Sequence, residues 1–167
     1  MFNIKKVLLF LLVLSSLVQA DMFSQGSKSI GIKLGSASIG NEDYTIVGVS
    51  GNYFIVDSLS VGLGYETWLG GNPDIDKITL ESTYFVEASE TVRPYAGVLY
   101  RRILISGSDR FGRNFDDLDS YGARAGVAFV QDDLLLSAGL VYERYDSRQR
   151  FFDNSETYLE LAIALSF

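Results

Sequence analysis

The chain has 167 residues, of which 47% are hydrophobic and 13% are aromatic, and its formal net charge is −7. This acidity argues against a nucleic-acid partner, because binding to phosphates requires a concentrated basic surface. The sequence contains no cysteine, which excludes disulfides, thiolate metal sites and acylation at a cysteine.

The first twenty residues have the pattern of a cleaved secretory signal peptide. Lys5 and Lys6 precede an apolar stretch from Val7 to Val18, and Ala20 supplies a small residue at the expected cleavage site. The stretch is too short to cross a bilayer comfortably, although a single membrane anchor is the alternative interpretation. Removal of residues 1–20 would change the formal charge to −9, and residues 21–28 would then form a short periplasmic segment.

In residues 29–167, large apolar residues alternate with small or polar ones at a period of two. The alternation runs in segments of about ten residues that are separated by turn-forming residues. This pattern predicts tilted membrane-spanning strands. We expect eight strands, over 29–39, 44–56, 59–69, 77–86, 92–105, 120–130, 134–146 and 157–167. Tight turns alternate with longer loops, which is typical of an all-β, eight-stranded antiparallel transmembrane barrel with an up-and-down meander. In such a barrel the short turns and both termini lie in the periplasm.

The strands of a soluble eight-stranded barrel would show the same alternation of side chains. The composition of the two strand faces therefore has to distinguish a soluble barrel from a membrane barrel. In residues 59–66 one face carries Leu, Val, Leu and Tyr, and the other carries Ser, Gly, Gly and Glu. Glycine and serine suit the crowded interior of a narrow barrel, so the large apolar face is expected to contact lipid. Aromatic residues on this face form two expected interfacial girdles, which are Tyr65, Tyr100, Tyr121 and Tyr142 near the loops and Tyr53, Tyr84, Phe129 and Phe167 near the turns.

The chain ends on Phe167, with Leu161, Ile163 and Leu165 on the same face. This ending resembles the carboxy-terminal assembly signal of bacterial outer-membrane proteins, and the mature chain resembles the OmpA/OmpX-type eight-stranded barrels. The resemblance implies export by the Sec route and insertion by the assembly machinery into the outer membrane of a Gram-negative bacterium. The expected surroundings are membrane lipid and lipopolysaccharide, and we expect a monomer.

Seven charged residues have inward parity, namely Lys33, Glu66, Glu81, Arg101, Arg124, Glu143 and Glu160. Charges of both signs in a narrow lumen are costly unless they are paired, so we expect them to form a network. Arg101 and Arg124 lie on adjacent strands flanked by those of Glu81 and Glu143, which allows a Glu-Arg-Arg-Glu row if the heights match. A packed polar core is the favoured interpretation, and a gate or narrow polar channel is the alternative.

The sequence contains no histidine, whereas the lipid A acyl transferases, lipid A deacylases, phospholipases and proteases among the outer-membrane barrels rely on it. A Ser–His triad, a His–Asp pair and an imidazole metal site are therefore excluded. The acidic run at 116–119 also lacks the ligand spacing of a calcium loop. We expect no enzymatic activity, no cofactor and no metal site.

Arginines alternate with aromatic residues in the two longest outward loops, 106–119 and 147–156. These candidate contacts are Arg110, Phe111, Arg113, Phe115, Arg148, Arg150, Phe151 and Phe152. Arginine binds phosphate in bidentate fashion and exposed aromatic residues favour partners, so lipopolysaccharide phosphates or a host or glycan ligand are possible partners. The alternative is that these residues only cover the barrel rim. The sequence predicts a structural envelope protein, with a surface adhesin or ligand-binding protein and a narrow channel as alternatives.

Overall fold

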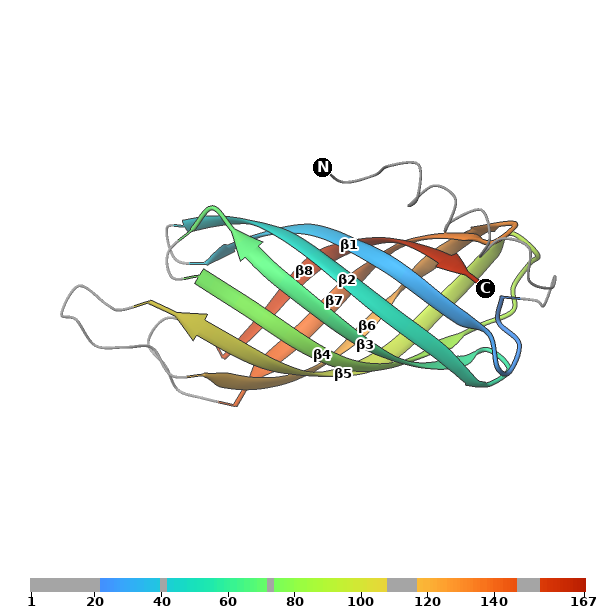
Figure 1. Cartoon of the computed structure of the whole chain (residues 1–167), viewed down its shortest axis with the longest axis horizontal. Helices are drawn as coiled ribbons and strands as arrows, with labels where there is room; N and C mark the ends of the chain where they lie inside the picture. Colours follow the sequence, from blue (N-terminus) through green and yellow to red (C-terminus); the bar gives the residue numbers. More distant parts are fainter. Residues whose placement is uncertain (1–21, 40–41, 72–73, 108–116, 147–153) are drawn as a thin grey trace, which may run out of the picture.

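Eight antiparallel strands follow one another around a closed barrel in the computed structural model of the chain (Figure 1). The structure describes residues 22–39, 42–71, 74–107, 117–146 and 154–167. The strands are β1 (Lys28–Ile39), β2 (Glu42–Val56), β3 (Leu59–Leu69), β4 (Asp74–Phe85), β5 (Val92–Ser106), β6 (Leu118–Gln131), β7 (Leu134–Tyr145) and β8 (Ser155–Ser166). The predicted fold class is confirmed, because the order is an uninterrupted meander in which β8 returns to pair with β1.

The observed strand ends differ from the expected ones by at most three residues. The largest difference is in β4, which begins at Asp74 instead of Lys77. Ile75 is only 1% exposed and continues the inward face of the strand, but the aspartates on either side of it gave this part of the sequence the composition of a loop.

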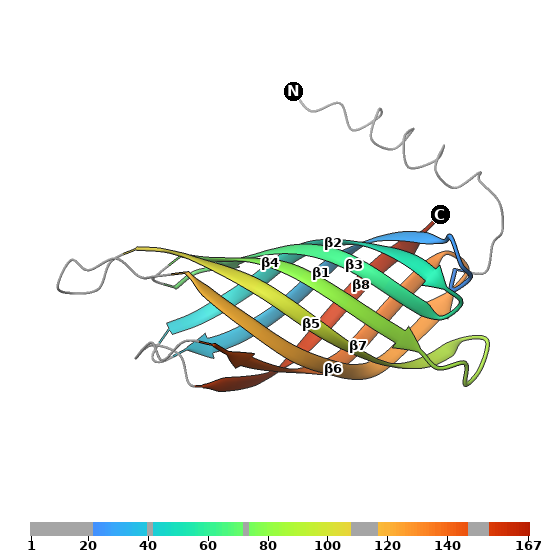
Figure 2. The same cartoon turned by 90° about the horizontal axis from the view of Figure 1, so that it is seen from below.

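Successive connections lie at alternate ends of the barrel (Figures 1 and 2). We call the end with the connections after β2, β4 and β6 the turn end. The end with the connections after β1, β3, β5 and β7, which include the two longest, is the loop end. Ser58 and Asp132 occupy two of the turns with φ angles of 65° and 53°. The C-terminus lies at the turn end (Figure 1). Among the described residues, none belongs to a helix with the length and apolar character that a membrane crossing requires.

Burial alternates along the strands, as the parity argument requires. In β4, Lys77, Thr79 and Glu81 are buried in the lumen, whereas Ile78 and Leu80 are about half exposed on the outer surface. A side chain thus reaches the interior at every second position of each strand. The interior of an eight-stranded barrel is only wide enough for such side chains, so the lumen is a packed core.

Two glycines make room for the ring of Tyr95 in the turn half of the lumen. A Cβ atom at Gly139 would overlap the hydroxyl of Tyr95 and lie 2.7 Å from the carbonyl oxygen of Ala125. A Cβ at Gly126 would lie 2.7 Å from the same hydroxyl. The inward glycines of β6 and β7 therefore allow Tyr95 of β5 to pack closely over the inner face of these two strands.

Candidate functional site

Eight charged side chains occupy the middle of the lumen, and none has a side chain more than 11% exposed. Four are cationic and four are anionic: Lys33, Lys77, Arg101 and Arg124, with Glu66, Glu81, Glu143 and Glu160. The set contains all seven residues to which the sequence assigned inward parity. It also contains Lys77, which shares the parity of Glu81 and was overlooked because it stands at the first position of its expected strand.

The layer nearer the loop end is centred on Arg101 and Glu143. Their side chains lie 2.9 Å apart, and Lys77 approaches the same carboxylate at 3.3 Å. Arg101 also contacts Glu66 at 3.2 Å. The Tyr158 hydroxyl donates to Glu143 at 3.1 Å, so one carboxylate receives hydrogen bonds from several strands.

The layer nearer the turn end is centred on Glu81 and Arg124, which lie 3.0 Å apart. Lys33 approaches Glu81 at 2.8 Å, and Arg124 reaches Glu160 at 3.1 Å. The second terminal nitrogen of Arg124 donates to the hydroxyl of Thr83 at 2.9 Å. Each buried charge in this layer therefore faces an opposite charge, which offsets the cost of its desolvation.

The two arginines do not share one row, which corrects the Glu-Arg-Arg-Glu arrangement considered from the sequence. In the β5–β6 register Arg101 stands opposite Ser120, whereas Arg124 stands opposite Gly97. The arginines are thus offset by four residues along the strands, and their shortest contacts are with different glutamates, Glu143 for Arg101 and Glu81 for Arg124. Glu160 connects the two layers, since its carboxylate lies 3.1 Å from Arg124 and 3.7 Å from Arg101.

An apolar cluster closes the lumen on the loop side of the charges. It consists of Tyr44, Ile46, Trp68, Ile75, Ile103, Ile105, Leu118 and Tyr145. The ammonium group of Lys77 lies 4.2 Å from the ring centre of Trp68, where the negative ring face attracts a cation. This contact joins the charged layer directly to the apolar cluster.

A second apolar cluster closes the lumen on the turn side. It consists of Met22, Phe23, Phe54, Phe85, Tyr95 and Ala128. The first two residues belong to the segment that precedes β1, and sequence reasoning missed their role because they lie before the alternating region. The only signal in the sequence was an apolar Met-Phe pair one residue after the expected cleavage site.

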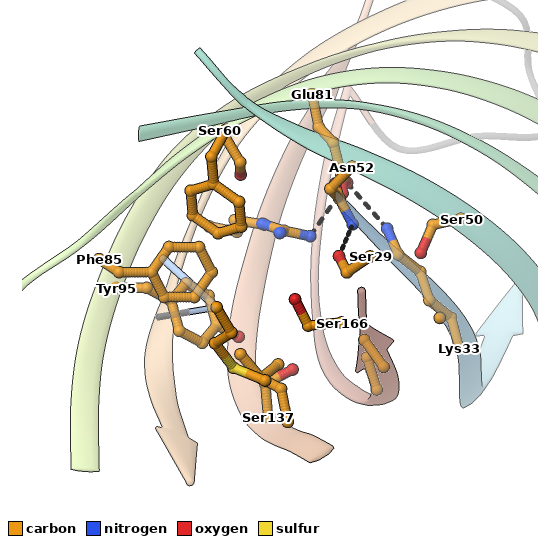
Figure 3. Close-up of a pocket in the computed structure, with 17 residues that line it drawn as sticks. Ser29, Lys33, Ser50, Asn52, Ser60, Glu81, Phe85, Tyr95, Ser137 and Ser166 are labelled. Carbon is orange, nitrogen blue, oxygen red and sulfur yellow. Dashed lines mark hydrogen bonds and ion pairs between the residues drawn. The ribbon is translucent and has the colours of Figure 1, made fainter. Parts of the chain in front are cut away.

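Between the turn-side cluster and the charges lies a cavity of about 50 Å³ (Figure 3). Its lining includes small polar side chains of several strands, among them Ser29, Ser50, Asn52, Ser137 and Ser166. No three His, Cys, Asp or Glu side chains of the described residues are arranged as a metal site would require. The cavity has a mixed polar and apolar lining, and it is too small for an organic ligand of ordinary size.

The residues expected in the two aromatic girdles lie on the outer surface. The loop-end set, Tyr65, Tyr100, Tyr121 and Tyr142, is 46–50% exposed, and the turn-end set, Tyr53, Tyr84, Phe129 and Phe167, is 38–53% exposed. Two of the loop-end tyrosines donate to carboxylates, Tyr65 to Asp76 at 2.8 Å and Tyr100 to Asp119 at 2.9 Å. Their hydroxyls thus meet polar groups while their rings lie on the apolar surface, as interfacial aromatic residues do.

Leu161, Ile163 and Leu165 also lie on the outer surface, on the same face of β8 as Phe167, and all three are close to half exposed. The eight candidate loop contacts fall at positions 110–115 and 148–152, which lie outside the described residues.

Comparison with solved structures places the barrel among small outer-membrane proteins in fold. The N-terminal barrel domain of OprF from Pseudomonas aeruginosa superposes with a TM-score of 0.65 at 17% identity, covering 86% of this chain and 98% of that one. Neisserial surface protein A gives a TM-score of 0.65 at 16% identity, with coverages of 84% and 96%. The attachment invasion locus protein Ail of Yersinia pestis, in complex with the heparin analogue sucrose octasulfate, gives a TM-score of 0.53 at 14% identity, with coverages of 86% and 99%.

The fold is that of the small eight-stranded outer-membrane barrels. At these identities the likeness concerns the fold alone. No protein-family model matches the chain, and no curated protein matches its sequence.

The charge network predicts that Glu143→Gln destabilises the barrel strongly. The substitution preserves volume but leaves Arg101 and Lys77 with one carboxylate fewer in a buried site, which costs about 3 kcal/mol of unfolding free energy. Equilibrium unfolding of refolded protein in lipid vesicles, followed by tryptophan fluorescence, measures the change. Glu90→Gln, the same substitution at an exposed turn residue, is expected to change stability by less than about 0.5 kcal/mol. Equal unfolding midpoints for the two variants would contradict a stabilising role of the network.

Proposed function

We propose that this chain is a monomeric, non-enzymatic protein of the Gram-negative outer membrane, with a structural role in the envelope and loops displayed at the surface. The observation that carries the proposal is the contrast between the two faces of the barrel wall. The outer face is apolar with aromatic residues near both strand ends, and the lumen is filled by paired charges between two apolar clusters. An apolar outer surface of this kind is suited to lipid.

Export and orientation belong to the same proposal. The signal-peptide pattern of residues 1–20 supports passage to the periplasm, and the long connections at one end of the barrel support an orientation with the turns and the termini in the periplasm. Phe167 would then serve as the terminal residue recognised by the assembly machinery. The absence of histidine from the whole sequence supports a role without acid–base or nucleophilic catalysis.

Expression in a Gram-negative host tests the location. We expect the protein in the outer-membrane fraction as a heat-modifiable band, with a mature N-terminus at Asp21 determined by mass spectrometry. Deletion of Phe167 should reduce the amount of folded protein in that fraction, whereas Phe167→Tyr, which keeps an aromatic end, should not. Recovery of the protein with residues 1–20 attached, or in a soluble fraction, would refute the proposal.

A narrow channel is the alternative that the filled lumen disfavours. Because apolar clusters lie on both sides of the charged layers, ions have no continuous polar path. We expect purified, refolded protein to give no stable single-channel steps in planar bilayers. Steps that change with Glu81→Gln or Arg124→Gln, but not with Glu90→Gln, would overturn the closed-lumen interpretation.

Surface binding through the loops is the second candidate function, and it rests on the alternation of arginine and aromatic residues at 110–115 and 148–152. Arginines at such spacing suit phosphate or sulfate groups, and heparin is a suitable probe of this chemistry. Deletion of residues 109–117 should abolish retention on immobilised heparin or host cells and leave the heat-modifiable gel shift intact. A matched deletion within the β4–β5 turn, residues 88–90, should leave retention unchanged. Retention that survives the loop deletion would count against this loop as the binding site.

A further inference from the structure

The segment Met22–Ser27 lies across the turn end of the barrel. The Ser58 amide donates to the carbonyl of Phe23 at 2.7 Å, and the Gly26 amide donates to the carbonyl of Phe54 at 2.9 Å. Both bonds join the segment to the β2–β3 hairpin. The segment is therefore attached by its backbone to one side of the barrel mouth and covers the mouth with its side chains.

The side chain of Phe23 fills the centre of this cover. It is 2% exposed, and its ring centre lies 4.9 Å from that of Phe85 and 5.6 Å from that of Phe54. The guanidinium of Arg93 lies 4.3 Å from the same ring centre. A residue outside the barrel strands thus makes the central contacts of the turn-side cluster, so this closure depends on a segment that could detach without breaking any strand pairing.

Met22 also lines the cavity described above, which Figure 3 shows in close-up. It extends from Ser29 and Ser166, at the turn end of β1 and β8, to Glu81 and Arg124 in the middle of the barrel. Its volume of about 50 Å³ suits roughly three or four water molecules. The lining includes the polar side chains of Ser29, Ser50 and Asn52, with which water in the cavity would form hydrogen bonds.

Beyond the cavity the lumen is blocked. Arg101 and Glu143 are 0% exposed, and Ile103 and Leu118 of the loop-side cluster are at most 1% exposed. Water that enters from the turn end can therefore reach the layer of Glu81 and Arg124 but meets a packed interior above it.

We propose that Met22–Ser27 is a removable plug over a hydrated vestibule, which opens from the turn end as far as the Lys33–Glu81–Arg124 layer when the segment detaches. Detachment breaks the backbone hydrogen bonds of the segment to the β2–β3 hairpin and the contacts of Phe23 and Met22, but it leaves the pairing of the eight strands intact. The barrel thus has a closed state and a half-open state, and neither provides a through path. This device goes beyond the structural role proposed above and is independent of the orientation in the membrane.

Cysteine accessibility tests the plug, because the chain has no cysteine of its own. Ser50→Cys places a nearly isosteric thiol in the cavity wall, where Ser50 is 7% exposed. The refolded, detergent-solubilised barrel is treated with methanethiosulfonate ethylammonium, and modification is followed by mass spectrometry. Because both ends of the barrel are accessible to the reagent in micelles, the modification rate depends only on the path from solution to the cavity. The heat-modifiable gel shift verifies that each variant is folded.

We expect slow modification of Ser50→Cys in the otherwise wild-type chain and an increase of about tenfold or more when Phe23→Ala is added, because truncation of a buried ring favours local opening. Glu90→Cys, in an exposed turn, should react rapidly in both backgrounds. Tyr44→Ala removes an equally buried ring from the loop-side cluster and should leave the Ser50→Cys rate unchanged.

Three results would overturn the proposal. Modification of Ser50→Cys as rapid as that of Glu90→Cys in the otherwise wild-type chain would mean that the segment does not seal the cavity. An unchanged rate with Phe23→Ala would mean that something else seals it. An equal increase with Tyr44→Ala would indicate general loosening of the barrel rather than a plug.

Discussion

The mutual pairing of eight charged side chains in a lumen only wide enough for side chains is the constraint on which the rest of the barrel depends. An isolated charge there would lose its hydration without compensation, so each ion requires an opposite charge at contact distance. Those contacts join strands that are not neighbours, as with Lys33 of β1 and Glu81 of β4 at 2.8 Å. The network therefore ties distant strands together, and it requires the strands that carry these charges, all except β2, to be in their correct register.

Register in turn depends on the tight turns, because a shift of one residue would exchange the two faces of a strand. Such a shift in β7 would move Glu143 into the lipid and a leucine or tyrosine into the lumen. The buried charges thus disfavour shifted strand pairings and also stabilise the native pairing. The apolar clusters on both sides separate the paired charges from bulk water, which strengthens their attraction.

Sequence reasoning succeeded where the information is local. The period of two and the contrast between small and large side chains identified the strands, their lipid-facing side and the residues with inward parity. Relative height in the lumen is not local, because it depends on the pairing offsets of successive strands. For that reason the sequence placed Arg101 and Arg124 on adjacent strands but could not show that they are four residues apart in register. The role of Met22 and Phe23 was hidden for a different reason, since a segment without alternation gives no indication of what it packs against.

The equal number of positive and negative charges in the centre of the lumen has an electrical consequence. The eight charges sum to zero, so the formal net charge of −7 is carried entirely by other residues. A voltage across a membrane does work of about 2.3 kcal/mol per elementary charge and 100 mV. For a neutral set that moves as one body these contributions cancel. The centre of this barrel, although it is rich in ions, would experience no net force from a transmembrane voltage.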